Sequence, residues 1–317
     1  MRASLTSQPR IGRFAPSPTG PLHFGSLVAA VASYLEARDG QWLLRIEDVD
    51  RPRAVAGMAA LQQEMLQAYG FEWEGAVIQQ SDRAALYDAA LTKLIAANLA
   101  YPCTCSRSAL AAYPDSRIGV DGARVYPGIC QHWQHGDPIP EGAAWRFRVG
   151  GVNAPDWVFV DQVQGTFSQQ LARDVGDFVL RRADGCTTYQ LAVVVDDLAQ
   201  GVTQVVRGAD LLDSTLRQMA LITALGGQVP DYAHVPVAVN AAGEKLSKQT
   251  LAPTLSVASE AERVGALWSV LSFLGQAPPD ALLRASQAEL WAWAKTHWLL
   301  DRVPKQRSMM VPTLRAL

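Results

Sequence analysis

A proline-rich turn near the N-terminus constrains the fold of this chain more than any other segment. Residues 13–26 read RFAPSPTGPLHFGS, and their three prolines and Thr-Gly step forbid a helix and fix a turn. A strand candidate at residues 10–14 precedes the turn, and a small-residue-rich helix candidate at residues 27–38 follows it. The first N–H groups of such a helix have no partner within it and favour phosphate. The segment therefore predicts a strand, a turn and a helix start that can bind an anion.

Two lysines more than two hundred residues later complement this turn. In the turn, His23 can donate to a phosphate oxygen, Gly25 allows close approach of a nucleotide, and Ser26 lies at the expected helix start. Lys245 and Lys248, in the sequence KLSKQ, follow a turn and can reach a triphosphate as point charges. They would stabilise the charge that develops on a leaving pyrophosphate. Alone, the first motif also fits an ordinary helix start, and the second a solvated basic loop.

The first hundred residues alternate between strands and helices. After the strand and helix at the turn, a strand is expected at residues 42–47, and helices at 55–69 and 81–97. This alternation predicts an α/β fold with a parallel sheet.

Residues 103–176 interrupt the alternation, because they are rich in glycine, proline and short polar turns and read as an insertion. The α/β pattern then resumes in a second half. Its strand candidates are residues 177–182, 189–195, 205–208 and 235–239. A helix is expected at residues 211–225, before the last of these strands. After residue 252 the chain is expected to be helical, with capping-box spacings at Ser259/Glu262 and Ser286/Glu289.

Three of the four cysteines lie in the insertion: Cys103, Cys105 and Cys130. Closely spaced thiolates in a chain without a secretory signal favour zinc, which takes four ligands. On chemistry alone the fourth ligand is His132 or His135, and Tyr126 is a less common candidate. Three free or buried cysteines are the alternative. A zinc ion here would be structural, because it lies away from the nucleotide motifs.

A second group of candidates suits an amino acid with two carboxyl groups. Period-two alternation puts Arg45 and Glu47 on one face of their strand, where Glu47 can bind an ammonium group. Arg13 and Arg207, each on a strand candidate, can clamp carboxylates, and Tyr189 completes the set.

Composition sets broad limits on the class of protein. The 317 residues are 49% hydrophobic, which is enough for about two domains, and the net charge of −2 shows no overall basic character. The sequence has no bilayer-length apolar run and no apolar signal-peptide region, so we expect a cytoplasmic protein whose residues 1–9 form a flexible tail.

Six ordered blocks of this sequence resemble the glutamyl-tRNA synthetases, a class I aminoacyl-tRNA synthetase family. They are RFAPSPTGPLHFGS, RIEDVDRPR, QQSDRAALY, YQLAVVVDD, VVRGADLL and KLSKQ. The chain ends about 70 residues after KLSKQ, where full-length members continue into an anticodon-binding region. This and the cysteine segment C-T-C…Y-x-x-x-C resemble the truncated paralogues, the glutamyl-Q tRNA(Asp) synthetases.

The resemblance implies a Rossmann-type class I catalytic domain. Its halves would be residues 10–102 and 177–252, separated by a zinc-binding insertion at 103–176 and followed by a small helical stem-contact-like domain at 253–317. By resemblance, glutamate would be bound by Arg13, Ala15, Ser17, Glu47, Tyr189 and Arg207. ATP would be bound by His23, Gly25, Ser26 and Lys248, with His23, Lys245 and Lys248 catalytic. One structural Zn²⁺ would be bound by Cys103, Cys105, Tyr126 and Cys130.

The same resemblance implies a reaction. L-Glutamate would be activated with ATP and Mg²⁺, then transferred to queuosine at the wobble position of tRNA(Asp), bound through its anticodon stem-loop by a monomeric enzyme. Three alternatives remain. They are a short conventional glutamyl-tRNA synthetase, a glutaminyl-type enzyme, which Arg13 in the RFAPSPTG opening disfavours, and a non-catalytic RNA-binding paralogue.

Overall fold

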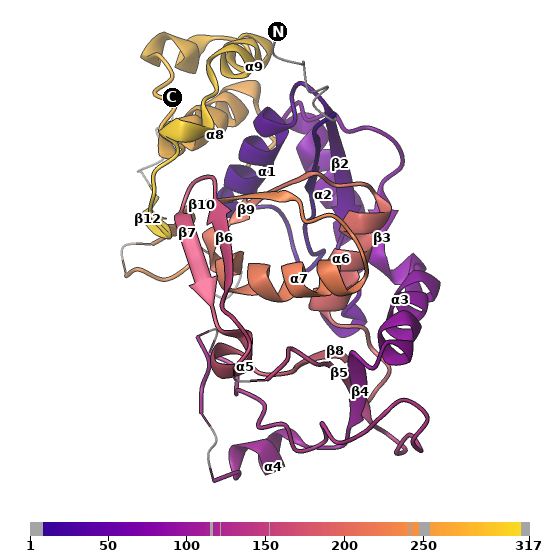
Figure 1. Cartoon of the computed structure of the whole chain (residues 1–317). Coiled ribbons are helices and arrows are strands. Elements are labelled where there is room, and N and C mark those ends of the chain that lie inside the picture. Colours follow the sequence, from indigo (N-terminus) through magenta and orange to yellow (C-terminus); the bar gives the residue numbers. More distant parts are fainter. Residues whose placement is uncertain are drawn as a thin grey trace, which may run out of the picture.

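Parallel strands form the central layer of the computed structural model (Figure 1). The structure describes residues 9–114, 117–120, 122–151, 153–240, 242–246 and 254–311. Strand β1 (Ile11–Phe14) pairs in parallel with β2 (Gln41–Ile46), and β2 pairs in parallel with β3 (Ile78–Gln79). The prediction of an α/β fold with a parallel sheet is confirmed.

A second parallel pair lies beside β1. It consists of β9 (Gln204–Gly208) and β10 (Asp231–Val235). The N–H of Thr203, just before β9, donates to the carbonyl of Ile11 in β1 over 3.0 Å. The two halves of the α/β unit are therefore adjacent, although the insertion separates them in sequence.

Helices α1 (Phe24–Glu36), α2 (Met58–Ala68) and α3 (Ala84–Ala96) follow the predicted segments of the first half. The prediction of a strand at residues 189–195 is wrong, because this segment is the start of helix α6 (Tyr189–Ala199). Leu191 to Asp197 are all buried, so α6 has apolar residues on every side and lacks the period that marks a surface helix. Helix α7 (Leu212–Ala224) follows β9 as expected.

Antiparallel strands form the insertion and its surroundings. Strand β4 (Ala100–Cys103) pairs with β5 (Ala144–Phe147), and β5 pairs with β8 (Phe178–Arg181). A hairpin of β6 (Trp157–Asp161) and β7 (Gly165–Gln169) runs from this sheet toward β10 (Figure 1). Two short helices complete the region, α4 (Arg107–Ala111) and α5 (Leu171–Asp174).

Helices α8 (Glu260–Phe273) and α9 (Gln287–His297) follow, and both begin with the predicted capping boxes. The chain then returns to the α/β unit, where β12 (Ser308–Met310) pairs in parallel with β11 (Val237–Val239). Pro236 separates β10 from β11. The strand predicted at residues 235–239 is therefore found as β11 and the last residue of β10, whereas residues 231–234 of β10 were not predicted.

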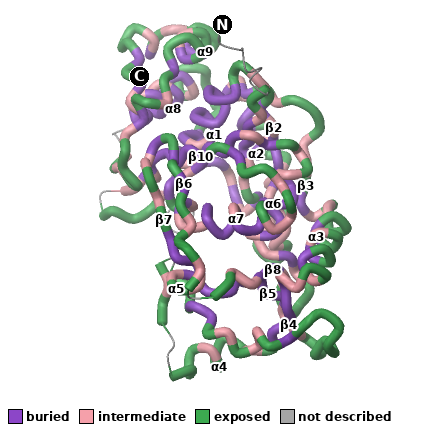
Figure 2. Tube along the Cα trace, viewed as in Figure 1, coloured by how far each residue is buried: buried purple, intermediate pink, exposed green. Residues whose placement is uncertain are grey.

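Buried hydrophobic side chains form two clusters. The tube in Figure 2 shows the buried positions concentrated in the interior of the molecule. The first cluster joins α1, β1 and β2 to α8 and α9, so the C-terminal helices share a core with the first half. The second joins α6 and α7 to β4, β5 and β8. None of the helices in the described part of the chain is long and apolar enough to cross a membrane.

Candidate active site

His23 is the N-cap of α1, at the end of the proline-rich turn. Its Nδ1 accepts from the N–H of Ser26 over 3.3 Å, and the Ser26 hydroxyl accepts from the N–H of His23 over 3.4 Å. Because Nδ1 is an acceptor here, the neutral ring carries its proton on Nε2, the form that can donate to a phosphate oxygen. Gly25 allows this arrangement, since a Cβ there would lie only 3.2 Å from Cε1 of His23.

A cavity of about 320 Å³ opens beside this turn. His23, Gly25 and Ser26 line it from one side, and Lys245 from the other. The ammonium group of Lys245 forms an ion pair with Asp210, which also lines the cavity. The structure thus brings the described ATP candidates together, whereas Lys248 lies outside the described residues.

Gln62 of α2 holds the turn in place. Its side chain is 1% exposed, and its Nε2 donates to the carbonyls of Ser17 and Gly20 over 3.1 and 2.7 Å. The N–H of Glu47 donates to the carbonyl of Pro16 over 2.9 Å. These bonds bring Ala15 and Ser17 beside the end of β2, where Glu47 lies.

Buried ion pairs connect β1 and β2 to α6. Nε and Nη2 of Arg13 donate to the two carboxylate oxygens of Asp197 over 3.1 and 3.4 Å. Nη1 of Arg45 lies 2.8 Å from Asp197, and Nη2 of Arg45 donates to Glu47 over 3.3 Å. Arg45 and Glu47 share a face as predicted. Asp197 uses two nitrogens of Arg13, which leaves Nη1 to reach a ligand.

Arg207 of β9 is fixed by partners from three other elements. Its Nε donates to Nε2 of His234 in β10 over 3.0 Å, and its Nη2 donates to the Thr215 hydroxyl in α7 over 3.0 Å. Its Nη1 donates to the hydroxyl of Tyr189 at the start of α6 over 3.5 Å. His234 in turn contacts Asp161 at the tip of the β6–β7 hairpin, with Nδ1 and Oδ2 2.6 Å apart.

The glutamate candidates form one electrostatic group. Burial raises the pKa of the Tyr189 hydroxyl, on which the charges of Arg207, Glu47 and Arg13 all act. Burial also raises the pKa of Glu47, against the lowering effect of Arg45 and Arg13. Burial opposes ionisation of Asp197 as well, but Arg13 and Arg45 outweigh it and hold the pKa of that carboxyl below its usual range.

This group lies next to the cavity that His23 and Lys245 line. Phe14 and Pro16, which flank Ala15, line the cavity, as does Gly208, which follows Arg207. Ser17 also lines it. An amino acid between Arg13, Glu47, Tyr189 and Arg207 would therefore have its reacting end close to a nucleotide in the cavity.

Several residues of the site were not identified from the sequence. Asp161, His234 and Gln62 all lie outside the sequence motifs that identified the other candidates. The carboxylate of Asp196 is 0% exposed and accepts from Gln80, Arg83 and Tyr87. The only sequence signal for these roles is a polar residue within an apolar segment, as at His234.

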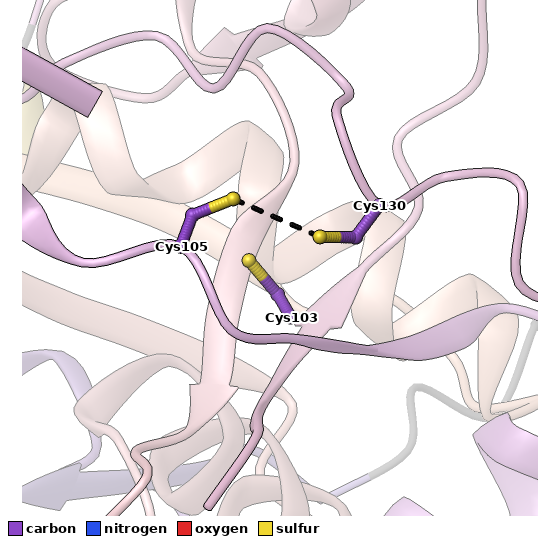
Figure 3. A group of neighbouring side chains, drawn as sticks. All are labelled: Cys103, Cys105 and Cys130. Atoms are coloured by element: carbon purple, nitrogen blue, oxygen red, sulfur yellow. Dashed lines mark hydrogen bonds between the residues drawn. The ribbon is translucent and has the colours of Figure 1, made fainter. Parts of the chain in front are cut away.

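The three cysteine sulfurs of the insertion lie within 4.8 Å of one another (Figure 3). Sγ of Cys105 is 3.7 Å from Sγ of Cys130, close to the edge of about 3.8 Å that a tetrahedron of Zn–S bonds requires. The Tyr126 hydroxyl lies 3.4 Å from Cys103 and 3.7 Å from Cys105.

This donor set, three sulfurs and one phenolic oxygen, fits zinc. Tyr126 is buried, and its hydroxyl also accepts from the N–H of Cys130 over 2.8 Å. His132 and His135 are exposed, and neither belongs to the cluster of metal-type side chains found among the described residues.

Comparison with known proteins places these features in a family. The model of the family described as tRNA synthetases class I (E and Q), catalytic domain, matches residues 11–277. A protein of Dechloromonas aromatica named glutamyl-Q tRNA(Asp) synthetase is 54% identical over 311 residues, covering 96% of this chain and 99% of that protein. One of the same name from Chromobacterium violaceum is 55% identical over 296 residues, covering 92% and 95%.

Solved structures support the fold. The crystal structure of a glutamate tRNA ligase from Elizabethkingia meningosepticum, in complex with its amino acid, aligns with a TM-score of 0.77 at 24% identity. The alignment covers 96% of this chain and 67% of that protein. The α/β fold of a class I synthetase catalytic domain is therefore confirmed.

Proposed function

The chain belongs to the glutamyl-Q tRNA(Asp) synthetase family of class I tRNA synthetases, and from this premise we propose that it activates L-glutamate with ATP and transfers it to queuosine in tRNA(Asp). The observation that carries the proposal is the juxtaposition of two groups of side chains. A cavity with His23 and Lys245 lies beside two buried arginines, a partly buried glutamate and a partly buried tyrosine, a set that complements an acidic amino acid.

In this proposal ATP lies in the cavity with its phosphates at the start of α1. Nε2 of His23 donates to a phosphate oxygen, and the N–H groups at Gly25 and Ser26 face the nucleotide. Lys245 and Lys248 stabilise the charge on the leaving pyrophosphate, and Mg²⁺ neutralises the phosphates.

Glutamate is held by its charged groups. Glu47 binds the ammonium group, Arg13 and Arg207 bind carboxylates, Tyr189 donates a hydrogen bond, and the backbone at Ala15 and Ser17 completes the site. The α-carboxylate attacks the α-phosphate of ATP in line, which gives glutamyl-adenylate and pyrophosphate. Positioning and charge stabilisation account for the rate, and the enzyme forms no covalent intermediate.

Transfer follows adenylate formation. A hydroxyl of the queuosine cyclopentenediol attacks the activated carbonyl, and AMP leaves. The protein binds tRNA(Asp) through its anticodon stem-loop and acts as a cytoplasmic monomer. Cys103, Cys105, Tyr126 and Cys130 would hold one structural zinc ion, which would tie β4 to the loop that carries Cys130.

The test is transfer of radiolabelled glutamate, with ATP, to tRNA(Asp) with and without queuosine, and to tRNA(Glu). Label on queuosine-containing tRNA(Asp) alone is the expected result. Label on tRNA(Glu) would identify a short conventional synthetase. Absence of label on every tRNA would support a non-catalytic RNA-binding protein. In the same preparation, Arg207→Ala should abolish glutamate-dependent ATP–pyrophosphate exchange and leave the far-ultraviolet dichroism unchanged.

A further inference from the structure

We propose that Asp161, at the tip of the β6–β7 hairpin, is a positioning residue that acts through His234 to fix Arg207 for glutamate binding. The inference rests on the proposed function, because it assigns to Arg207 the binding of the amino acid. The side chains of this hydrogen-bonded series are all buried. Asp161 is 2% exposed, His234 0% and Arg207 5%, and Thr215, which also contacts Arg207, is 0% exposed.

The hydrogen bonds that link Arg207, His234 and Asp161 have a defined direction. A carboxylate only accepts, so Nδ1 of His234 carries the proton that lies between it and Oδ2 of Asp161, 2.6 Å away. Nε2 of His234 is then unprotonated and accepts from Nε of Arg207 at 3.0 Å. Burial lowers the pKa of His234 to about 4, so the ring is neutral at pH 7 and keeps this acceptor.

The second oxygen of Asp161 fixes the orientation of its side chain. Oδ1 accepts three backbone N–H groups, those of Val163, Gln164 and His234, over 3.0, 2.8 and 3.0 Å. In an Asp161→Asn variant these donors require the amide oxygen at Oδ1, which places the NH₂ group opposite Nδ1 of His234. That NH₂ group must donate, so the imidazole proton moves to Nε2, where the Thr215 hydroxyl, 3.3 Å away, can accept it but where Nε2 no longer accepts from Arg207.

The N–H at Nε of Arg207 then faces the N–H at Nε2 of His234 in a buried site. Arg207 thus loses the acceptor of its Nε, although the side chain at position 161 keeps its size. The cost of an unpaired buried donor corresponds to a rise of about 10–100-fold in a dissociation constant. Because Arg207 binds glutamate in the ground state and the transition state alike, the effect falls on KM for glutamate and not on kcat. The hairpin of the insertion thus supports the amino-acid site directly.

The measurement is ATP–pyrophosphate exchange by the full chain as glutamate and ATP are varied in turn, together with calorimetric titration of glutamate. D161N should raise KM for glutamate about 10–100-fold and leave KM for ATP within about twofold of the wild-type value. The matched control is D177N. Asp177 is an equally buried carboxylate of the same region, which accepts from Tyr101, Gln131 and Val149 and has no bond to Arg207.

Two further variants separate positioning from general stability. In an R207K background, which has no Nε, D161N should change KM for glutamate by less than about threefold. If D161N fails to fold, T215V serves instead, because it removes the nearer of the two acceptors of Nη2 and leaves the Leu211 carbonyl at 3.4 Å; it should raise KM for glutamate while KM for ATP stays constant.

The possible results all decide the question. Absence of glutamate-dependent exchange in the wild-type protein would overturn the proposed function and the inference with it. Exchange by the wild-type protein with an unchanged KM for glutamate in D161N would overturn the inference alone. So would equal rises in KM for glutamate in D161N and D177N, or equal effects of D161N in the wild-type and R207K backgrounds, because both indicate a loss of structure and not of positioning.

Discussion

Asp197 balances the charge of two arginines that water hardly reaches, so Asp197→Asn tests the ion pairs beneath the site. The side chains of Arg13 and Arg45 are 4% and 0% exposed, and their nearest nitrogens lie 3.1 and 2.8 Å from Oδ1 of Asp197. Asparagine keeps the shape and an acceptor oxygen but removes the charge.

The magnitude follows from the two pairs. With an effective dielectric constant near 20 and charges about 4 Å apart, each pair contributes about 4 kcal/mol of attraction. Desolvation of the carboxylate offsets part of this sum. Removing one partner of a buried pair leaves the other uncompensated, so we expect D197N to lower the free energy of unfolding by about 3–5 kcal/mol at pH 7.

Urea denaturation followed by tryptophan fluorescence measures this loss, and its pH dependence identifies the cause. The pKa of Asp197 is lowered in the folded state, because Arg13 and Arg45 outweigh the burial that opposes ionisation. A lowered pKa gives stability that is present above the unfolded value of about 3.9 and lost as pH falls through the folded value. The gap between wild type and D197N should be constant from about pH 5 to 8 and narrow below about pH 4.

D39N is the matched control. Asp39 is 88% exposed and lies 3.9 Å from Arg38, so this substitution should change stability by less than about 1 kcal/mol. A D197N effect as small as that of D39N, or a gap that does not narrow in acid, would refute the assignment of these pairs as strongly coupled and buried.

Three further substitutions test other parts of the site. E47Q should leave the free energy of unfolding at pH 7 unchanged or higher, because the pKa of Glu47 is raised in the folded protein and its ionisation therefore destabilises the fold as pH rises. The same substitution should raise KM for glutamate about tenfold. Q62A removes both bonds to the turn and should cost about 1–3 kcal/mol in urea denaturation, with a raised KM for ATP. Y126F should weaken zinc binding about tenfold in competition with a chromophoric chelator, and KM for glutamate should stay unchanged.

Local patterns of the sequence predicted the parts of the fold that local forces determine. The prolines before α1, the serine and glutamate pairs at α8 and α9, and the strand that carries Arg207 were all found where expected. Each depends on neighbouring residues, through fixed φ angles, cap hydrogen bonds or strand alternation. Helix α6 was not predicted, because burial on all sides removes the periodic signal.

The residues that fix Arg207 could not be predicted in this way. Asp161 and His234 are 73 positions apart, and they meet only because the β6–β7 hairpin runs alongside β10. A single polar residue in an apolar strand indicates a buried polar partner but does not identify it. The roles expected of Arg207 and Glu47 came from charge complementarity as well as from resemblance, and charge alone does not assign a particular carboxylate to Arg13 or Arg207.

Helix α6 explains why the proposed amino-acid site requires both halves of the catalytic unit. Its first residue, Tyr189, contacts Arg207 of the second half, and Asp197 near its end pairs with Arg13 and Arg45 of the first. Within the first half only Glu47 pairs with Arg45, so Arg13 and Arg45 gain their shared carboxylate, Asp197, only when α6 is in place. A fragment ending before the insertion would leave two buried arginines without their main carboxylate, so the first half alone should neither fold stably nor bind glutamate.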